Sequence, residues 1–189
     1  MPRQNLPKFS EIRIIGGTCR GRKIKFPELE GLRPTPNRIR ETLFNWLAPS
    51  IQGANCLDLF AGSGALGFEA LSRGAQHALM LDASADICHA LMENKNKLGL
   101  ASAEIVQANF PYPPSILATR PYDIVFLDPP FHCGYVQQAL EWLKVNCLPP
   151  GALIYIESES RDDVIPLPLD WQILKDKRAG NVRYTLITN

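Results

Sequence analysis

The sequence lacks long hydrophobic runs, paired cysteines and clustered histidines. No apolar segment approaches the roughly 20 residues of a membrane span, and residues 1–8 hold no apolar stretch of signal-peptide length. The five cysteines are odd in number, widely spaced and without a Cys-x-x-Cys pair, and the three histidines do not stand at metal-ligand spacing. These absences predict a cytoplasmic protein with reduced thiols, no membrane contact and no metal.

The 189-residue chain also has little net charge, formally +1. Its charges are, however, unevenly distributed along the sequence. Residues 1–50 contain ten Lys or Arg and four acids, a net of +6, whereas residues 51–189 contain ten bases and fifteen acids, a net of −5. We therefore expect a basic extension over residues 1–50 that contacts a polyanion, and a catalytic domain over residues 51–189. A solvated basic arm without a partner is the alternative.

The extension is predicted to contain a hairpin and a helix. Residues 11–27 have the pattern of a hairpin with a glycine-containing turn. This turn directs three basic side chains outward, those of Arg20, Arg22 and Lys23. Thr35 then stands where it would cap a helix whose first residue is Pro36. That helix would run to Leu47 and bury one apolar stripe.

Strand and helix patterns alternate through the rest of the chain. Strands are predicted over 56–60, 77–82, 104–107, 123–128 and 151–157, and helices over 64–73, 84–98 and 134–146. This rhythm is typical of a Rossmann-like α/β fold, a mostly parallel sheet with helices on both faces. Residues 171–177 and 182–188 flank a turn signal and predict a closing antiparallel hairpin. Such an arrangement is the pattern of class I S-adenosylmethionine-dependent methyltransferases.

A glycine-rich segment follows the first strand of this alternating region, at Asp58-Leu59-Phe60-Ala61-Gly62-Ser63-Gly64-Ala65-Leu66-Gly67. Gly62 and Gly64 allow a sharp turn close to a cofactor, and Gly67 allows a helix to pack closely on a strand. The same spacing occurs in dinucleotide-binding proteins, so an NAD-dependent oxidoreductase is an alternative. Asp58 favours S-adenosylmethionine, because a carboxylate suits its ammonium group and repels a pyrophosphate.

Further cofactor contacts are expected at the ends of the neighbouring strands. Asp82 ends the second strand, where an acidic side chain commonly accepts hydrogen bonds from both ribose hydroxyls. Asn109 follows the third strand and would lie near the adenine, with Ala108 and Phe110 in the wall of its pocket. Phe60, within the glycine-rich segment, completes the predicted cofactor site.

Asp128-Pro129-Pro130-Phe131 follows the fourth strand and predicts the chemistry. The lone pair of a nucleobase exocyclic amine is delocalised into the ring, so two acceptors are needed to make the nitrogen pyramidal and direct the lone pair at a methyl group. The Asp128 carboxylate and the Pro129 carbonyl are suitable acceptors, and the prolines stiffen the loop. Phe131 offers a ring on which an extruded base can stack. The motif therefore predicts methylation of a nucleobase amine.

Two N-terminal blocks resemble the RsmD family of bacterial small-subunit ribosomal RNA guanine-N2 methyltransferases. They are Arg13-Ile14-Ile15-Gly16-Gly17-x-x-Arg20-Gly21-Arg22-Lys23 and Arg33-Pro34-Thr35-x-x-Arg38-x-Arg40-Glu41-Thr42-Leu43-Phe44-Asn45-Trp46-Leu47. The glycine-rich segment and the Asp-Pro-Pro-Phe motif follow at the expected places, so the likeness covers nearly the whole chain. Asn37 stands where the family often has Asp.

This resemblance implies a donor, an acceptor and further site residues. S-adenosylmethionine would be the methyl donor, and N2 of one guanine in a loop of 16S ribosomal RNA the acceptor. The RNA would belong to an assembled or nearly assembled 30S particle, whose ribosomal proteins would contribute to recognition. Three residues of the second block would lie beside the base pocket, namely Arg33, Thr35 and Arg38, while the basic hairpin would hold phosphates.

Without the resemblance, the residues leave guanine and adenine as equal targets, and three alternatives stand. An N6-adenine DNA or RNA methyltransferase could use the same Asp-Pro-Pro-Phe chemistry, although the chain has no separate target-recognition domain. An NAD-dependent oxidoreductase would share the glycine turn but leave Asp128 to Phe131 without a role. A non-catalytic RNA-binding module would bind RNA without turnover.

Overall fold

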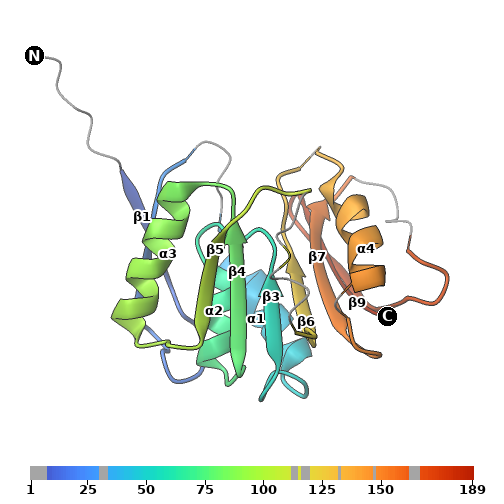
Figure 1. Ribbon diagram of the computed structural model, residues 1–189, viewed down its shortest axis with the longest axis horizontal. Coiled ribbons are helices and arrows are strands. Elements are labelled where there is room, and N and C mark those ends of the chain that lie inside the picture. The colour runs from blue at the N-terminus through green and yellow to red at the C-terminus, as the bar shows by residue number, and fades with distance from the viewer. Residues whose placement is uncertain are drawn as a thin grey trace, which may run out of the picture.

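The computed structural model describes residues 8–29, 34–111, 115, 120–131, 133–146, 148–161 and 167–189. Its centre is a seven-stranded sheet in the order β5-β4-β3-β6-β7-β9-β8 (Figure 1). The strands are β3 (Asn55–Asp58), β4 (His77–Asp82), β5 (Ala103–Gln107), β6 (Ile124–Leu127), β7 (Leu153–Glu159), β8 (Gln172–Ala179) and β9 (Val182–Thr188). Strands β3 to β7 run parallel, and β8 and β9 form the antiparallel end. The predicted fold class is thus confirmed.

The helices cover both faces of this sheet. Helices α1 (Asn37–Leu47), α2 (Ala65–Ser72) and α3 (Ala85–Leu98) contribute to one core cluster, and α4 (Tyr135–Asn146) to the cluster on the opposite face. Helices α1 and α3 each bury one apolar stripe, whereas every residue of α2 is buried. All four residues of β6 are buried, as expected for a central strand covered on both sides. In α3 the predicted ends are confirmed: the Ser84 hydroxyl accepts from the Ile87 N–H, and Gly99 closes the helix at φ +73°.

A separate two-stranded sheet, β1 (Phe9–Arg13) with β2 (Lys23–Pro27), forms the predicted hairpin. It packs against α3 (Figure 1). The side-chain amide of Asn94 accepts from the Lys25 N–H at 3.1 Å and donates to the Lys25 carbonyl at 2.6 Å. The Arg22 guanidinium donates to the Leu98 carbonyl at 3.0 Å and to the Lys97 carbonyl, at the C-terminal end of α3. A cation is stabilised there by the helix dipole. Arg22 is exposed, as predicted, but its guanidinium is bound to the end of α3.

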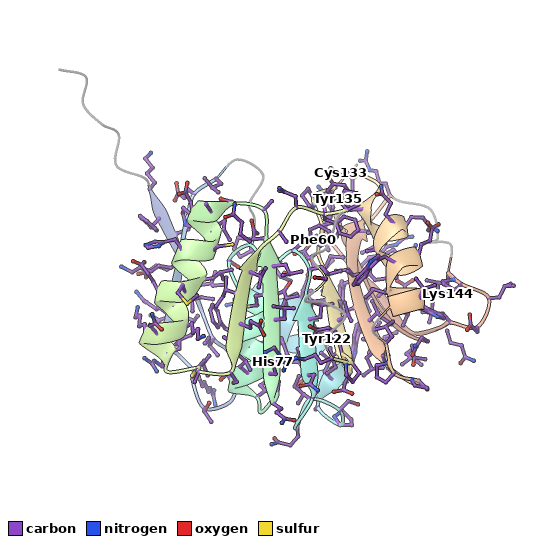
Figure 2. All side chains as sticks on the ribbon, viewed as in Figure 1. Phe60, His77, Tyr122, Cys133, Tyr135 and Lys144 are labelled. Atoms are coloured by element: carbon purple, nitrogen blue, oxygen red, sulfur yellow. The ribbon has the colours of Figure 1, made fainter. Side chains whose placement is uncertain are left out.

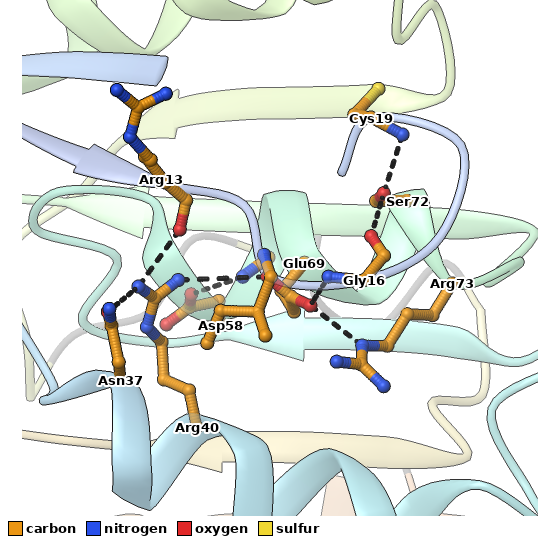
Figure 3. A network of polar contacts seen from close by, with 11 residues as sticks. Arg13, Gly16, Cys19, Asn37, Arg40, Asp58, Glu69, Ser72 and Arg73 are labelled. Carbon is orange, nitrogen blue, oxygen red and sulfur yellow. Dashed lines mark hydrogen bonds and ion pairs between the residues drawn. The ribbon is translucent and has the colours of Figure 1, made fainter. Parts of the chain in front are cut away.

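A buried carboxylate on α2 fixes the start of this hairpin turn (Figure 3). Both oxygens of Glu69 accept backbone N–H groups, from Ile15 and from Gly16, each at 2.8 Å. The same carboxylate accepts from the Arg73 Nε at 2.7 Å and lies 3.7 Å from Nη1 of Arg40. Glu69 is fully buried, so these partners replace the water that its charge would otherwise require.

Arg40, on α1, connects this carboxylate to two further segments. Its Nη2 donates to the Arg13 carbonyl at 3.0 Å and to the Asn37 side-chain oxygen at 2.6 Å. Burial lowers the pKa of Arg40, and the nearby Glu69 charge opposes that shift. Strand β1, helix α1 and helix α2 therefore meet at one buried ion pair, and apolar residues of the extension, such as Ile14 and Phe44, lie in the same core as the central sheet.

Within the part of the chain that the structure describes, no helix is long and apolar enough to cross a membrane.

Candidate active site

Three carboxylate side chains meet at the carboxyl ends of adjacent parallel strands. Asp58 is the last residue of β3, and Asp128 directly follows β6. Ile156 of β7 pairs with Leu127 of β6, so Glu157 stands level with Asp128. Ligands of open α/β sheets bind at this edge. The sequence predicted Asp58 and Asp128 here but not Glu157, whose one signal was an acid directly after the apolar run of β7.

Asp58 lies under the glycine turn, only 2% exposed. Its Oδ2 accepts from the Gly67 N–H at 3.2 Å, whereas its buried Oδ1 has no hydrogen-bond partner among the described residues. Burial raises the pKa of Asp58 to about 7. A buried acceptor without a donor is costly, and an ammonium group placed against Oδ1 would satisfy it. The residues present therefore fit the amino acid end of S-adenosylmethionine.

Two glycines of the glycine-rich segment stand where a side chain would not fit. Gly64 adopts φ +77°, and a Cβ there would lie 2.6 Å from side-chain atoms of Leu91 and Phe68. A Cβ on Gly67 would lie 2.4 Å from the Met80 sulfur, which confirms the close packing of α2 on β4. Close packing inside the protein therefore requires glycine at both positions, and the left-handed backbone requires it at Gly64 as well.

Asp82 closes the other side of the turn. Its Oδ2 accepts from the Gly62 N–H at 3.0 Å and its Oδ1 from the Ser84 N–H at 2.9 Å. Each carboxylate oxygen can accept a second hydrogen bond, so the side chain is oriented and still able to receive ribose hydroxyls. The turn and the strand end are thus one rigid unit.

An aromatic cluster stands beside this unit, and Figure 2 shows two of its members, Phe60 and Tyr135, together at the carboxyl edge. The rings of Phe60 and Tyr135 are stacked, with centroids 5.9 Å apart, and Phe110 packs edge-on against both at 5.3 Å. Tyr135 was not predicted, because its place at the start of α4 gives no local signal. Asn109, next to Phe110, is exposed. The cluster forms an apolar wall that suits a planar ring.

Asp128 is held by the N-terminal extension. The Thr35 hydroxyl donates to its Oδ2 at 3.3 Å. The predicted capping role of Thr35 was wrong: α1 begins after Pro36 with no side-chain cap, because the hydroxyl faces the carboxylate instead. Burial, reinforced by the charges of Glu157 and Asp58, raises the pKa of Asp128 well above its usual range. Pro129 is buried, and the Phe131 ring is 38% exposed and so open to stacking.

Glu157 completes the acidic group. It is 3% exposed, and its Oε1 accepts from the Tyr155 hydroxyl at 2.8 Å. Burial raises the pKa of Glu157, and hydrogen bonds from Tyr155 and Thr35 oppose the shift. Two buried carboxyl groups and the half-buried Asp128 lie at one strand edge, where their ionised forms are disfavoured. A cationic ligand would stabilise the ionised forms, whereas a pyrophosphate would not. Among the residues that the structure describes, no three His, Cys, Asp or Glu side chains are placed so that they could hold one metal ion together.

Over residues 12–188 the sequence matches the protein family described as conserved hypothetical protein 95. The chain belongs to this family. Ribosomal RNA small subunit methyltransferase D of Escherichia coli K12 is 45% identical over 98% of this chain and 94% of its own length. The Haemophilus influenzae protein of the same name is 45% identical, over 95% of this chain and 94% of its own length. These relatives confirm the resemblance to RsmD.

Solved structures agree with this assignment to the conserved hypothetical protein 95 family. The Escherichia coli protein yhhF, a proposed methyltransferase, superposes with a TM-score of 0.86 at 43% identity, over 95% of this chain and 98% of that one. A T. thermophilus 16S rRNA N2-guanine methyltransferase, RsmC, in complex with AdoMet and guanosine, gives a TM-score of 0.69 over all of this chain and 52% of that one. At 20% identity that match supports the fold alone.

The N-terminal blocks that resemble RsmD dock the extension onto the family's catalytic fold. A Cβ on Gly17 would lie 1.7 Å from the Ser72 carbonyl, so the chain can pass the end of α2 only as glycine. The Thr18 N–H donates to that carbonyl at 2.8 Å, and the Cys19 N–H to the Ser72 hydroxyl at 2.9 Å. Arg40, in the second block, is the buried partner of Glu69.

The hairpin turn does not reach the acidic group. Helices α2 and α3 begin at the carboxyl edge and end at the opposite edge, and the turn is bound where they end. Arg20 and Arg22 are therefore about 12 Å, the length of α2, from the predicted pocket. Lys23 pairs with Glu11 at 2.6 Å on the hairpin itself. Arg38 is exposed in the first turn of α1, while Arg33 lies outside the described residues.

Proposed function

We propose that this protein transfers the methyl group of S-adenosylmethionine to N2 of one guanine in 16S ribosomal RNA. The observation that carries the proposal is that Asp128, which accepts a hydrogen bond from Thr35, and Asp58, whose Oδ1 has no partner among the described residues, stand at the carboxyl ends of two paired strands. Relatives named as small-subunit RNA methyltransferases over almost the same length support the acceptor. We further propose that the substrate is an assembled or nearly assembled 30S particle with its ribosomal proteins, in the cytoplasm.

S-adenosylmethionine supplies a methyl group on a positively charged sulfur. Asp58 would bind its ammonium group, Asp82 its ribose hydroxyls, and the Phe60 wall the adenine, with Asn109 at its rim. Asp128 and the Pro129 carbonyl would accept the two amine hydrogens of guanine, so that the nitrogen lone pair points at the methyl carbon. When bound, S-adenosylmethionine would supply the methyl carbon for the new N–C bond as its S–C bond breaks, with that electron pair left on sulfur. The nitrogen then releases one proton to Asp128 or to water.

Cofactor affinity is expected to weaken as the pH falls through 7. The empty protein holds a proton on Asp58 below its pKa of about 7, and an ammonium ligand requires the ionised form, so binding releases that proton. Between pH 7 and pH 6 the affinity should drop about fivefold. Calorimetry in two buffers of different ionisation enthalpy measures both the affinity and the proton release. Asp58→Asn should bind weakly without this pH dependence, and a flat wild-type profile would contradict the assignment.

The acceptor is tested by transfer of a labelled methyl group to small ribosomal subunits that lack the modification, followed by nucleoside analysis. Labelled N2-methylguanosine is the expected product. Labelled N6-methyladenosine would keep the chemistry and overturn the target base. Transfer to naked RNA but not to particles would overturn the proposed assembly stage, and binding without transfer would indicate a non-catalytic RNA-binding module.

A further inference from the structure

We propose that the exposed edge strand β8 binds phosphates of the RNA whose target base enters the Asp128 site; this inference rests on the proposed function. The residues concerned are Lys175, Lys177 and Arg178, here called the β8 basic strip. Lys175 and Lys177 lie on one face of the strand and Arg178 on the other, so their long side chains flank the exposed edge from both sides. Their surface lies at the antiparallel end of the sheet, on the opposite side of Asp128 from the N-terminal hairpin. It was not among the RNA contacts that the sequence predicted.

The pairing register places the strip level with the acidic site. Lys177 pairs with Tyr184 of β9, and Tyr184 pairs with Glu157 of β7. Glu157 is level with Asp128, so the Lys177 backbone stands three strand spacings from Asp128, about 14 Å at 4.8 Å per spacing. At about 3.4 Å per nucleotide along one strand, roughly four nucleotides cover that distance. An RNA segment next to the target base can therefore reach the strip.

The charge of the strip is available for an anion. Asp176, the one acid in β8, is bound by Arg183 through two hydrogen bonds of 2.9 Å and by the Thr185 hydroxyl at 3.0 Å. The hydrogen bonds from Arg183, and to a smaller extent that from Thr185, lower the pKa of Asp176. The negative charge of Asp176 is therefore compensated by Arg183. Arg178 pairs directly with Arg183 in the ladder. The charge of Arg178 also contributes to the lowered pKa of Asp176, and Arg178 is itself exposed, so a phosphate can approach it.

An aromatic platform supports the same surface. Trp46 of α1 stacks on Tyr184 with centroids 5.5 Å apart, and the Lys177 ammonium lies over the Trp46 ring at 5.8 Å. The contact with Trp46 keeps the Lys177 ammonium near the strand level of Glu157, and Lys177 remains exposed. The hairpin turn has no such placement, because Arg22 binds the end of α3 and Lys23 pairs with Glu11.

A different role for these residues is protection of the sheet edge, since lysines on an edge strand discourage pairing with another copy. Ile173 and Leu174, at the other end of β8, are 45% and 43% exposed. Under that alternative, loss of the strip charges produces oligomers and leaves RNA affinity unchanged. The two roles therefore predict different measurements on the same variant.

The test compares K177Q/R178Q with K97Q/K144Q, a charge-matched pair on α3 and α4, and with R20Q on the hairpin turn. Fluorescence anisotropy with a labelled single-stranded RNA oligonucleotide gives Kd at several salt concentrations, and methyl transfer to unmodified small subunits gives KM and kcat. For K177Q/R178Q we expect Kd and KM to rise on the order of tenfold, with kcat unchanged. Each phosphate contact on a single strand contributes about 0.7 to the slope of log Kd against log salt, so loss of two contacts should lower the slope by about 1.4.

The outcomes are distinguishable. Unchanged RNA affinity in K177Q/R178Q, with or without oligomers in sedimentation, overturns the inference, as does an equal loss in K97Q/K144Q. A loss of RNA affinity in R20Q alone would show that the hairpin turn, and not the β8 basic strip, binds the phosphates. If the wild-type protein methylates no particle but K177Q/R178Q still binds the oligonucleotide more weakly with a reduced salt slope, the RNA surface stands and the proposed acceptor fails. Melting temperatures confirm that each variant is folded.

Discussion

Replacing Asp128 with alanine is expected to abolish methyl transfer while S-adenosylmethionine still binds. The carboxylate is the acceptor that orients the substrate amine, and loss of one preorganised group of this kind lowers kcat by about 10²–10³-fold. The fold should tolerate the change, because Asp128 is half-buried among like charges that raise its pKa. Single-turnover methyl transfer and cofactor calorimetry measure the two effects separately.

Two companion variants make this prediction specific. Asp86→Asn removes an exposed carboxylate from the first turn of α3 and should leave transfer and binding unchanged. Thr35→Val removes the hydroxyl that donates to Asp128 and should lower kcat less than Asp128→Ala does. Comparable loss of cofactor affinity and of transfer in Asp128→Ala would mean that Asp128 belongs to the cofactor site instead.

Replacing Glu69 with leucine is expected to lower the free energy of unfolding by about 3–5 kcal/mol. The change leaves the buried Arg40 guanidinium without its counter-charge and removes the acceptor of the Ile15 and Gly16 N–H groups. Urea denaturation, followed by circular dichroism, measures the loss. In the double variant Arg40→Met, Glu69→Leu the fully buried Arg40 charge is removed, and only the partly exposed Arg73 loses its partner. This variant should therefore recover part of the lost stability. A loss below about 1 kcal/mol in the single variant would show that water or another group replaces the pair.

Local sequence signals were enough to predict the sheet and the positions of Asp58 and the glycine turn. The strands are short apolar runs, Ser84 and Gly99 bound α3 as their residue types require, and the glycine spacing around Gly64 permits one kind of turn. Asp58 could be predicted because it ends a strand directly before that turn. In each case the decisive interaction lies within a few residues along the chain.

The features that were missed depend on partners far away in the sequence. Thr35 has the pattern of a helix cap, yet its hydroxyl faces Asp128, 93 residues later. Arg22 has the pattern of an exposed turn residue, yet its guanidinium binds the end of α3, 76 residues away. Glu157 becomes part of the site only through the pairing of β7 with β6. Periodicity and propensity carry no information about such pairings, so the substrate side of the site was harder to predict.

The Glu69 carboxylate has a consequence for how this protein can be divided. It lies on the helix that follows the glycine turn, two residues after Gly67, and it binds the backbone of the extension directly. Removing residues 1–50 would strip α1 and the hairpin from a shared core, and the Glu69 carboxylate would lose Arg40 and two backbone N–H donors and keep Arg73. The N-terminal segment therefore cannot be exchanged alone: a chimera that borrows it from a relative must also take the matching residues of α2.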